Sequence, residues 1–118
     1  MIVSYKDLNV YQKSYKLLLD VYEKTKELPK DEMYGITSQV RRAAMSISLN
    51  IAEGYGKHTS ESEFKRYLSI AIGSANEVEV LIDLMKDLKY LTQEEHEQYI
   101  ERYIEVRKML FGLREKWN

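Results

Sequence analysis

The chain has 118 residues, which is enough for one domain with a real core but not for two. It carries 18 Lys and Arg against 19 Asp and Glu, so any attraction to nucleic acid must come from a local cluster of charge. Cysteine is absent, which excludes disulfides and thiolate chemistry, and we see neither a signal peptide nor an apolar run of bilayer length. We expect a single cytoplasmic domain, residues 1–118, that binds no membrane.

The first two predicted helices cover residues 5–27 and 33–53. In the first, apolar residues recur at alternating spacings of three and four, which predicts a buried face made of Leu8, Tyr11, Tyr15, Leu18 and Tyr22. The second helix is apolar on two opposite sides. One side, expected in the core, consists of Ile36, Val40, Ala44, Ile47 and Ile51, and the other consists of Met45, Leu49 and Ala52. Gly54 and Gly56 predict a left-handed C-cap after this helix.

The last two predicted helices each begin with a capping-box pattern. Ser60 and Glu63 open the third helix, residues 60–88, and Thr92 and Glu95 open the fourth. The predicted buried face of the third helix is Phe64, Leu68, Ala71, Ala75, Val78, Ile82 and Met85. That of the fourth is Tyr99, Tyr103, Val106, Leu110, Leu113 and Trp117. Four helices joined by short loops predict an all-α fold, an antiparallel up-down-up-down four-helix bundle.

The third helix repeats the two-sided pattern, with Ile70, Gly73, Leu81 and Leu84 projecting away from its buried face. A mid-helix glycine costs about 1 kcal/mol relative to alanine, which is most simply offset where another backbone approaches closely. We therefore favour a symmetric homo-oligomer that uses the outer face of the second and third helices over scattered apolar residues on a monomer surface. The predicted interface residues are Arg42, Met45, Leu49, Ala52, Ile70, Gly73, Glu77 and Leu84.

The up-down topology gathers basic residues at one pole, formed by the chain start, the loop between the second and third helices, and the end of the fourth. Concentrated positive charge of this kind attracts phosphate backbones. The alternative is that these charges only complement helix dipoles. The predicted nucleic-acid-binding residues are Lys57, Lys65, Arg66, Arg41, Arg42, Arg114 and Lys116.

A narrow polar stripe on the second helix consists of Gln39, Arg42, Ser46, Asn50 and Glu53. Arg42 and Glu53 are too far apart on one helix to pair, so we expect a partner helix or subunit to satisfy these groups. We favour such a structural network over a catalytic site.

Signatures of catalysis and of metal binding are missing from the sequence. Neither His58 nor His96 belongs to a Glu-x-x-His pair, and with no cysteine the chain lacks the ligands of a transition-metal site. Ser46 and Ser48 have no histidine at a spacing typical of a triad, and no glycine-rich nucleotide motif is present. We expect no enzymatic activity, no metal and no cofactor.

Residues 8–14, 34–44, 46–54 and 71–77 resemble the small four-helix-bundle proteins first recognised as open reading frames in intervening sequences of bacterial 23S ribosomal RNA genes. The most specific element is an Arg41-Arg42-Ala43 helix that ends in Asn50-Ile51-Ala52-Glu53-Gly54. The chain departs from the family at Ser48, where proline is usual. The resemblance implies a homopentameric barrel of four-helix bundles. It also implies a relation to the accessory proteins of diversity-generating retroelements, which bind nucleic acid through a basic surface and associate with a reverse transcriptase.

We therefore expect a non-enzymatic homopentamer that binds RNA or DNA, or scaffolds a nucleic-acid-processing partner such as a reverse transcriptase. The alternative is a structural protein–protein adaptor that binds no nucleic acid.

Overall fold

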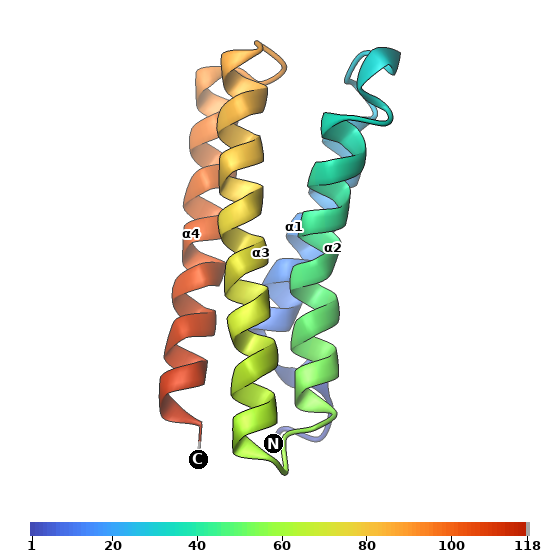
Figure 1. The fold of residues 1–118 in the computed structure, drawn as a ribbon. Coiled ribbons are helices and arrows are strands. Elements are labelled where there is room, and N and C mark those ends of the chain that lie inside the picture. The colour runs from blue at the N-terminus through green and yellow to red at the C-terminus, as the bar shows by residue number, and fades with distance from the viewer. Residues whose placement is uncertain (118) are drawn as a thin grey trace.

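The computed structural model describes residues 1–117 and shows a bundle of four α-helices, with no strand in that range. The helices are α1 (Asn9–Thr25), α2 (Ile36–Tyr55), α3 (Glu61–Asp87) and α4 (Gln93–Lys116), and short 3-10 turns lie at Tyr5–Asp7 and Lys30–Glu32. Successive helices run in opposite directions, and both termini lie at the same end as the α2–α3 loop (Figure 1). The predicted antiparallel four-helix bundle is confirmed. A helix long and apolar enough to span a bilayer does not occur among residues 1–117.

The buried face of α1 differs from the predicted one. Leu8 is buried as expected, but Tyr15 is 46% exposed and three other predicted members, Tyr11, Leu18 and Tyr22, are only half-buried. The residues that enter the core are Val10, Ser14, Leu17, Val21 and Thr25. Two of these residues, Ser14 and Thr25, are polar, so a search for periodic apolar residues does not identify this face. The Ser14 hydroxyl is hydrogen-bonded to the Ser48 hydroxyl of α2 at 2.9 Å, and Thr25 Oγ1 donates to the Val21 carbonyl at 2.7 Å, so both can be buried without loss of hydrogen bonding.

In α2, the predicted core side is confirmed, because Ile36, Val40, Ala44, Ile47 and Ile51 are all buried. The predicted left-handed glycine cap is wrong. No glycine in the described chain has a positive φ, and Gly56 ends α2 in an ordinary helical conformation. Gly54 instead permits a close approach of α2 to α3: a Cβ at this position would lie 2.7 Å from Tyr67 Cβ and 3.1 Å from Phe64 Cδ1.

The ends of α3 and α4 follow the predicted capping in part. Thr92 and Glu95 form the full reciprocal capping box of α4. At α3, Ser60 Oγ accepts from the Glu63 amide, but the Ser60 amide already donates to the Lys57 carbonyl, and Glu63 instead accepts from Arg66. The C-terminus of α3 is closed by Lys89 at φ 67°, with the Tyr90 amide donating to the Met85 carbonyl at 2.8 Å.

The core lies between the helices, and all seven predicted core residues of α3 are buried in it. In α4, Tyr103, Val106 and Leu110 are buried, while Tyr99, Leu113 and Trp117 pack at the edge of the core. The predicted faces of both helices are thereby confirmed, except that Leu81, assigned to the outer side of α3, is also buried.

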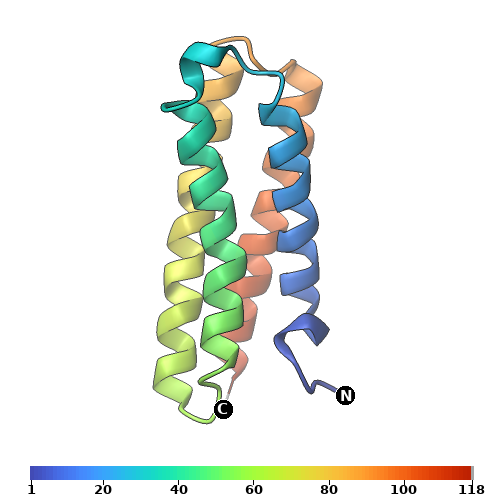
Figure 2. The same cartoon turned by 90° about the vertical axis from the view of Figure 1, so that its right-hand side faces the viewer.

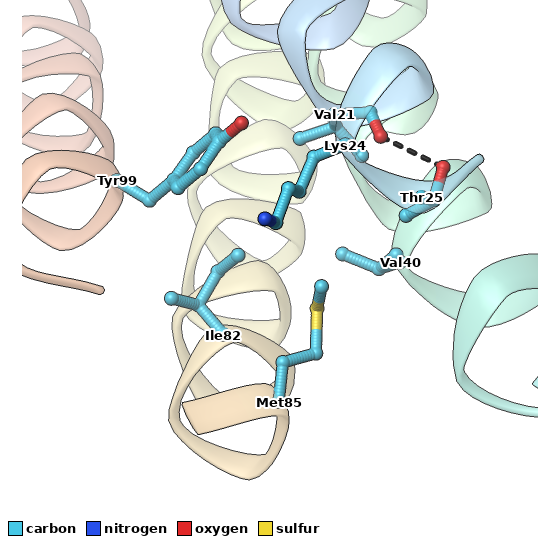
Figure 3. Close-up of a pocket in the computed structure, with 7 residues that line it drawn as sticks. All are labelled: Val21, Lys24, Thr25, Val40, Ile82, Met85 and Tyr99. Atoms are coloured by element: carbon cyan, nitrogen blue, oxygen red, sulfur yellow. Dashed lines mark hydrogen bonds between the residues drawn. The ribbon is translucent and has the colours of Figure 1, made fainter. Parts of the chain in front are cut away.

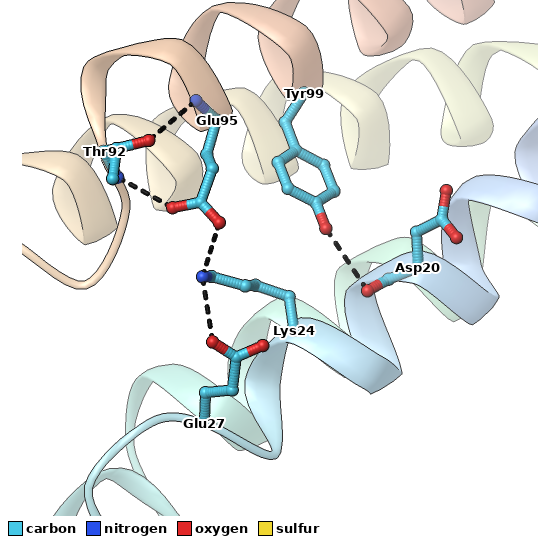
Figure 4. Close-up of polar contacts among 6 residues, drawn as sticks. All are labelled: Asp20, Lys24, Glu27, Thr92, Glu95 and Tyr99. Carbon is cyan, nitrogen blue, oxygen red and sulfur yellow. Dashed lines mark hydrogen bonds and ion pairs between the residues drawn. The ribbon is translucent and has the colours of Figure 1, made fainter.

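The seam between α1 and α4 is mainly polar. Three ion pairs bridge it: Lys24 to Glu95 at 2.6 Å, Arg102 to Asp20 at 2.7 Å, and Lys13 to Glu105 at 3.2 Å. Figure 4 shows the part of this seam near the start of α4, where the Tyr99 hydroxyl also donates to the Asp20 carbonyl. The tightly packed apolar interfaces therefore lie elsewhere, along α2–α3 and α3–α4.

Candidate interaction surfaces

Five of the seven predicted nucleic-acid-binding residues come together at the end of the bundle that carries both termini. They are Lys57, Lys65, Arg66, Arg114 and Lys116, and we call them the basic pole. Lys57 lies in the α2–α3 loop, Lys65 and Arg66 lie in the first turns of α3, and the other two lie at the end of α4 (Figure 1). The pole exists because each helix reverses the direction of the one before it.

An aromatic cluster holds this end of the bundle in place. The His58 ring stacks on Tyr55 with centroids 4.6 Å apart, and Trp117 packs edge-on against Phe64 at the same distance. His58 also contacts Trp117 edge-on at 6.2 Å, so the α2–α3 loop is tied to the C-terminus. The basic pole therefore rests on an ordered surface.

Carboxylates of the same helix neutralise part of the basic pole. Lys65 pairs with Glu61 at 2.8 Å and Arg66 with Glu63 at 2.9 Å. The hydrogen bond from Arg66 holds the pKa of the Glu63 carboxyl below its usual range. Arg114 donates to Ser69 Oγ at 3.1 Å, which links α4 to α3. Because these contacts are largely exposed, an incoming phosphate can replace them at little energetic cost.

Two cations of the basic pole share one aromatic ring, which the sequence reading did not single out. The Arg66 guanidinium lies 4.5 Å from the centroid of the Tyr67 ring, and Lys57 Nζ lies 5.8 Å from it. Lys57 has no ion-pair partner among residues 1–117, and neither has Lys116. The only signal in the sequence is that Tyr67 directly follows Arg66, because the approach of Lys57 depends on the loop.

Arg41 and Arg42 do not join the basic pole, since both lie in the first part of α2, toward the opposite end. Arg41 connects α2 to α1: its Nε donates to Thr25 Oγ1 at 2.8 Å, and its guanidinium lies 4.5 Å from the Tyr22 ring centroid. Arg42 is exposed and forms no ion pair with any described residue. These two arginines therefore have different roles, one internal and one at the surface.

Most residues of the predicted oligomer interface are exposed on α2 and α3. Four of its apolar members, Leu49, Ile70, Gly73 and Leu84, form what we call the α2–α3 face. Met45, also predicted in the interface, instead lines a groove with Tyr22 of α1. Leu49 is 60% exposed, Ile70 and Leu84 are 40% exposed, and Ala52 beside them is half-buried. A Cβ on Gly73 would meet nothing within 4 Å, so no contact inside this chain requires a glycine there. Glu77, one turn further along α3, is exposed as well.

The polar stripe of α2 is partly satisfied within the chain. Ser46 Oγ and Ser74 Oγ are hydrogen-bonded at 2.8 Å, and Asn50 Nδ2 donates to the Ser46 carbonyl at 2.8 Å. Ser74 of α3 thus supplies the partner helix expected for Ser46, whereas Asn50 is satisfied within α2 itself. Gln39, Arg42 and Glu53 remain exposed, beside the α2–α3 face.

A recess among the four helices offers no room for a ligand. Figure 3 shows this recess, lined by Val21, Lys24, Thr25, Val40, Ile82, Met85 and Tyr99, and it is too narrow for a water molecule. Beside it, the Lys24 ammonium group donates to Glu95 at 2.6 Å and to Glu27 at 3.1 Å (Figure 4). Within the described part of the chain, no three His, Asp or Glu side chains are grouped so that they could hold a metal ion.

Comparison with known proteins agrees with this architecture. The model of the 23S rRNA-intervening sequence protein family matches residues 6–112. A crystal structure at 1.70 Å resolution is similar over 91% of this chain and 96% of the other, with a TM-score of 0.82 and 27% sequence identity. It is of a protein with unknown function from the S23 ribosomal protein family, from Bacteroides thetaiotaomicron VPI-5482. No match was found among curated proteins.

Proposed function

The chain belongs to the 23S rRNA-intervening sequence protein family, and we propose that it is a non-enzymatic homopentamer whose basic pole binds nucleic acid. The observation that carries this proposal is the pair of cations at Tyr67. Lys57 and Arg66 approach the same ring at the exposed end of the bundle, and Lys57 has no carboxylate partner among the described residues. Positive charge at an exposed site without a carboxylate partner attracts the phosphate groups of a nucleic-acid backbone.

The binding is electrostatic and largely independent of base sequence. The cations of the basic pole come from a loop and from helix ends, so they do not form a row along one helix that could reach base edges. A ring in which all bundles point the same way would place every copy of the basic pole on one rim. This arrangement supplies the local charge that a net charge of −1 does not.

In its wider form, the proposal includes a protein partner. A ring that holds nucleic acid on one rim can present it to a processing enzyme, such as a reverse transcriptase, and the resemblance to retroelement accessory proteins supports that role. The second candidate is a protein–protein adaptor that binds no nucleic acid. It is favoured by the pairing of Lys65 and Arg66 with carboxylates of their own helix.

Binding of the purified protein to structured RNA and to duplex DNA, measured over a range of salt concentrations, tests the proposal. Affinity should fall steeply as salt rises, because each neutralised phosphate releases counterions. Replacing Lys57, Lys65 and Arg66 together with glutamate should abolish binding. Replacing Lys26, Lys30 and Lys86 with glutamate changes the net charge equally at the opposite end and should weaken binding far less. If the unmodified protein fails to bind even at low salt, the adaptor is the better description.

Light scattering tests the assembly separately. The unmodified protein should have the mass of several chains, with five expected from the family resemblance. Leu49→Glu should dissociate the assembly and leave the helical circular dichroism unchanged, because Leu49 is 60% exposed in the single bundle. Loss of helix in this variant would place Leu49 in the bundle core, and a monomeric unmodified protein would contradict the proposed oligomer.

A further inference from the structure

The bundle exposes a second apolar surface, on α1. Tyr15 and Leu19 lie one turn apart on this helix and are 46% and 52% exposed, and we call them the α1 ridge. Figure 2 shows α2 with α1 on one side and α3 on the other. The α1 ridge and the α2–α3 face therefore lie on neighbouring sides of the bundle.

The presence of two different apolar surfaces bears on how copies could join. A two-fold dimer needs only one self-complementary surface, whereas a head-to-tail contact needs two different ones.

Two serine pairs place these surfaces at the same height along the bundle. The Ser14–Ser48 hydrogen bond, 2.9 Å, links the middle of α1 to α2, and the Ser46–Ser74 hydrogen bond, 2.8 Å, links the same part of α2 to α3. Ser46 and Ser48 differ in height by about 3 Å, at a rise of 1.5 Å per residue. Because α1 and α3 run in the same direction, Tyr15 next to Ser14 is level with Gly73 next to Ser74 to within a few ångströms.

The two surfaces carry charges of opposite sign, and the α2–α3 face lacks a side chain at Gly73. At Gly73 no side chain projects from α3, and an added Cβ would meet nothing within 4 Å, so a side chain of another molecule can approach the helix backbone there. Lys16, beside the α1 ridge, and Glu77, one turn above Gly73, are both exposed, and neither has an ion-pair partner among residues 1–117. Lys16 and Glu77 differ little in their position along the bundle axis, and a lysine side chain is long enough to span that difference.

We propose that copies of this chain join head to tail, with the α1 ridge of one copy packed on the α2–α3 face of the next. Tyr15 then fills the space at Gly73, and Lys16 pairs with Glu77. This inference rests on the homo-oligomer proposed above and names its contact. If the copies are related by rotation about an axis parallel to the bundle, each residue keeps its position along that axis. The α1 ridge of one copy then lies opposite the α2–α3 face of the next, because both surfaces are at the same level. The two contact surfaces face in different directions, so each copy is turned relative to the one before it and the repeated contact can close into a ring.

Mixing two defective variants distinguishes a head-to-tail contact from a two-fold contact. Leu19→Glu damages only the α1 ridge, and Leu49→Glu damages only the α2–α3 face. In sedimentation velocity, each variant alone should be monomeric. An equimolar mixture should form a particle of about twice the 14.0-kDa chain mass, since each variant keeps the surface that the other needs. Phe111→Glu is the matched control: Phe111 on α4 is as exposed as Leu19, 52%, and its replacement should leave the assembly unchanged.

A charge exchange gives an independent readout. Lys16→Glu and Glu77→Lys should each move assembly to higher protein concentration, and the chain that carries both changes should assemble like the unmodified protein. The head-to-tail contact is overturned if Leu19→Glu keeps the unmodified mass, if the mixture contains monomers only, or if the double exchange restores nothing. Each of these outcomes leaves the proposed oligomer intact, whereas a monomeric unmodified protein contradicts the proposed oligomer itself.

Discussion

The ion pair between Lys24 and Glu95 makes the stability of the bundle depend on pH. The hydrogen bond from Lys24, and next that from the Thr92 amide, hold the pKa of the Glu95 carboxyl below its usual range. A carboxyl with a lowered folded-state pKa contributes its stability fully above its unfolded pKa of about 4.3, and loses it as the pH falls through the folded pKa. Glu95→Gln should therefore lower the free energy of unfolding by about 1 kcal/mol at pH 7 and by nearly nothing near pH 2. Urea unfolding at both pH values checks this, and an equal loss at both would rule out the ionic contribution.

The Tyr103 hydroxyl is buried in the core without a hydrogen-bond partner among the described residues. Burial raises the pKa of Tyr103 far above its ordinary value, so the group stays protonated. A buried, unpaired hydroxyl destabilises the folded state by about 1–3 kcal/mol. We expect Tyr103→Phe to raise the free energy of unfolding by about 1 kcal/mol in urea titrations. Phe64→Tyr, which adds a hydroxyl at another fully buried site, should have the opposite effect. A clear loss of stability in Tyr103→Phe would show that the hydroxyl is hydrogen-bonded in solution.

At the scale of the helices, the buried Gly54 of α2 and the exposed Gly73 of α3 should respond oppositely to alanine. At Gly54 an added Cβ would lie 2.7 Å from Tyr67 Cβ, so α2 and α3 would have to separate. Gly54→Ala should destabilise the fold by about 1–3 kcal/mol. At Gly73 the space is open, and alanine should stabilise α3 in the single chain by up to about 1 kcal/mol. Thermal unfolding and light scattering together test the pair, because Gly73→Ala should weaken assembly while it strengthens the helix. Equal destabilisation by both changes would place Gly73 in a contact within the chain.

The helices and most of their buried faces could be predicted from the sequence, because long apolar periodicity and capping patterns are local signals. The face of α1 could not, since Ser14 and Thr25 are polar residues that become buried through hydrogen bonds, one of them to another helix. The basic pole followed from the alternating direction of the helices. The internal position of Arg41 did not, because its partners Thr25 and Tyr22 lie on α1, and their distance from α2 depends on tertiary packing.

At the scale of the whole molecule, the four helices should differ in local stability. Two of the three ion pairs across the α1–α4 seam are exposed, whereas α3 contributes nine buried residues to the core between α2 and α4. Exposed ion pairs contribute little and weaken with salt. Amide hydrogen exchange should therefore be faster in α1 than in α3, and added salt should widen the difference. Leu49→Glu is the appropriate background for this experiment, because it removes protection caused by assembly. Equal exchange of the two helices would mean that the bundle opens only as a unit.

The chain's two ends are neighbours, and this has a consequence for its connectivity. Ile2, Leu8 and Val10 line the same groove as Leu113 and Lys116, so the first and last residues of the bundle lie side by side. A short linker could join them, and new ends could be opened in the α1–α2 loop at the opposite end. The permuted chain would read α2, α3, α4, α1 and would retain every contact between helices. We therefore expect the permuted chain to fold into the same bundle, and a cargo protein attached to its new ends would lie at the end of the bundle away from the basic pole.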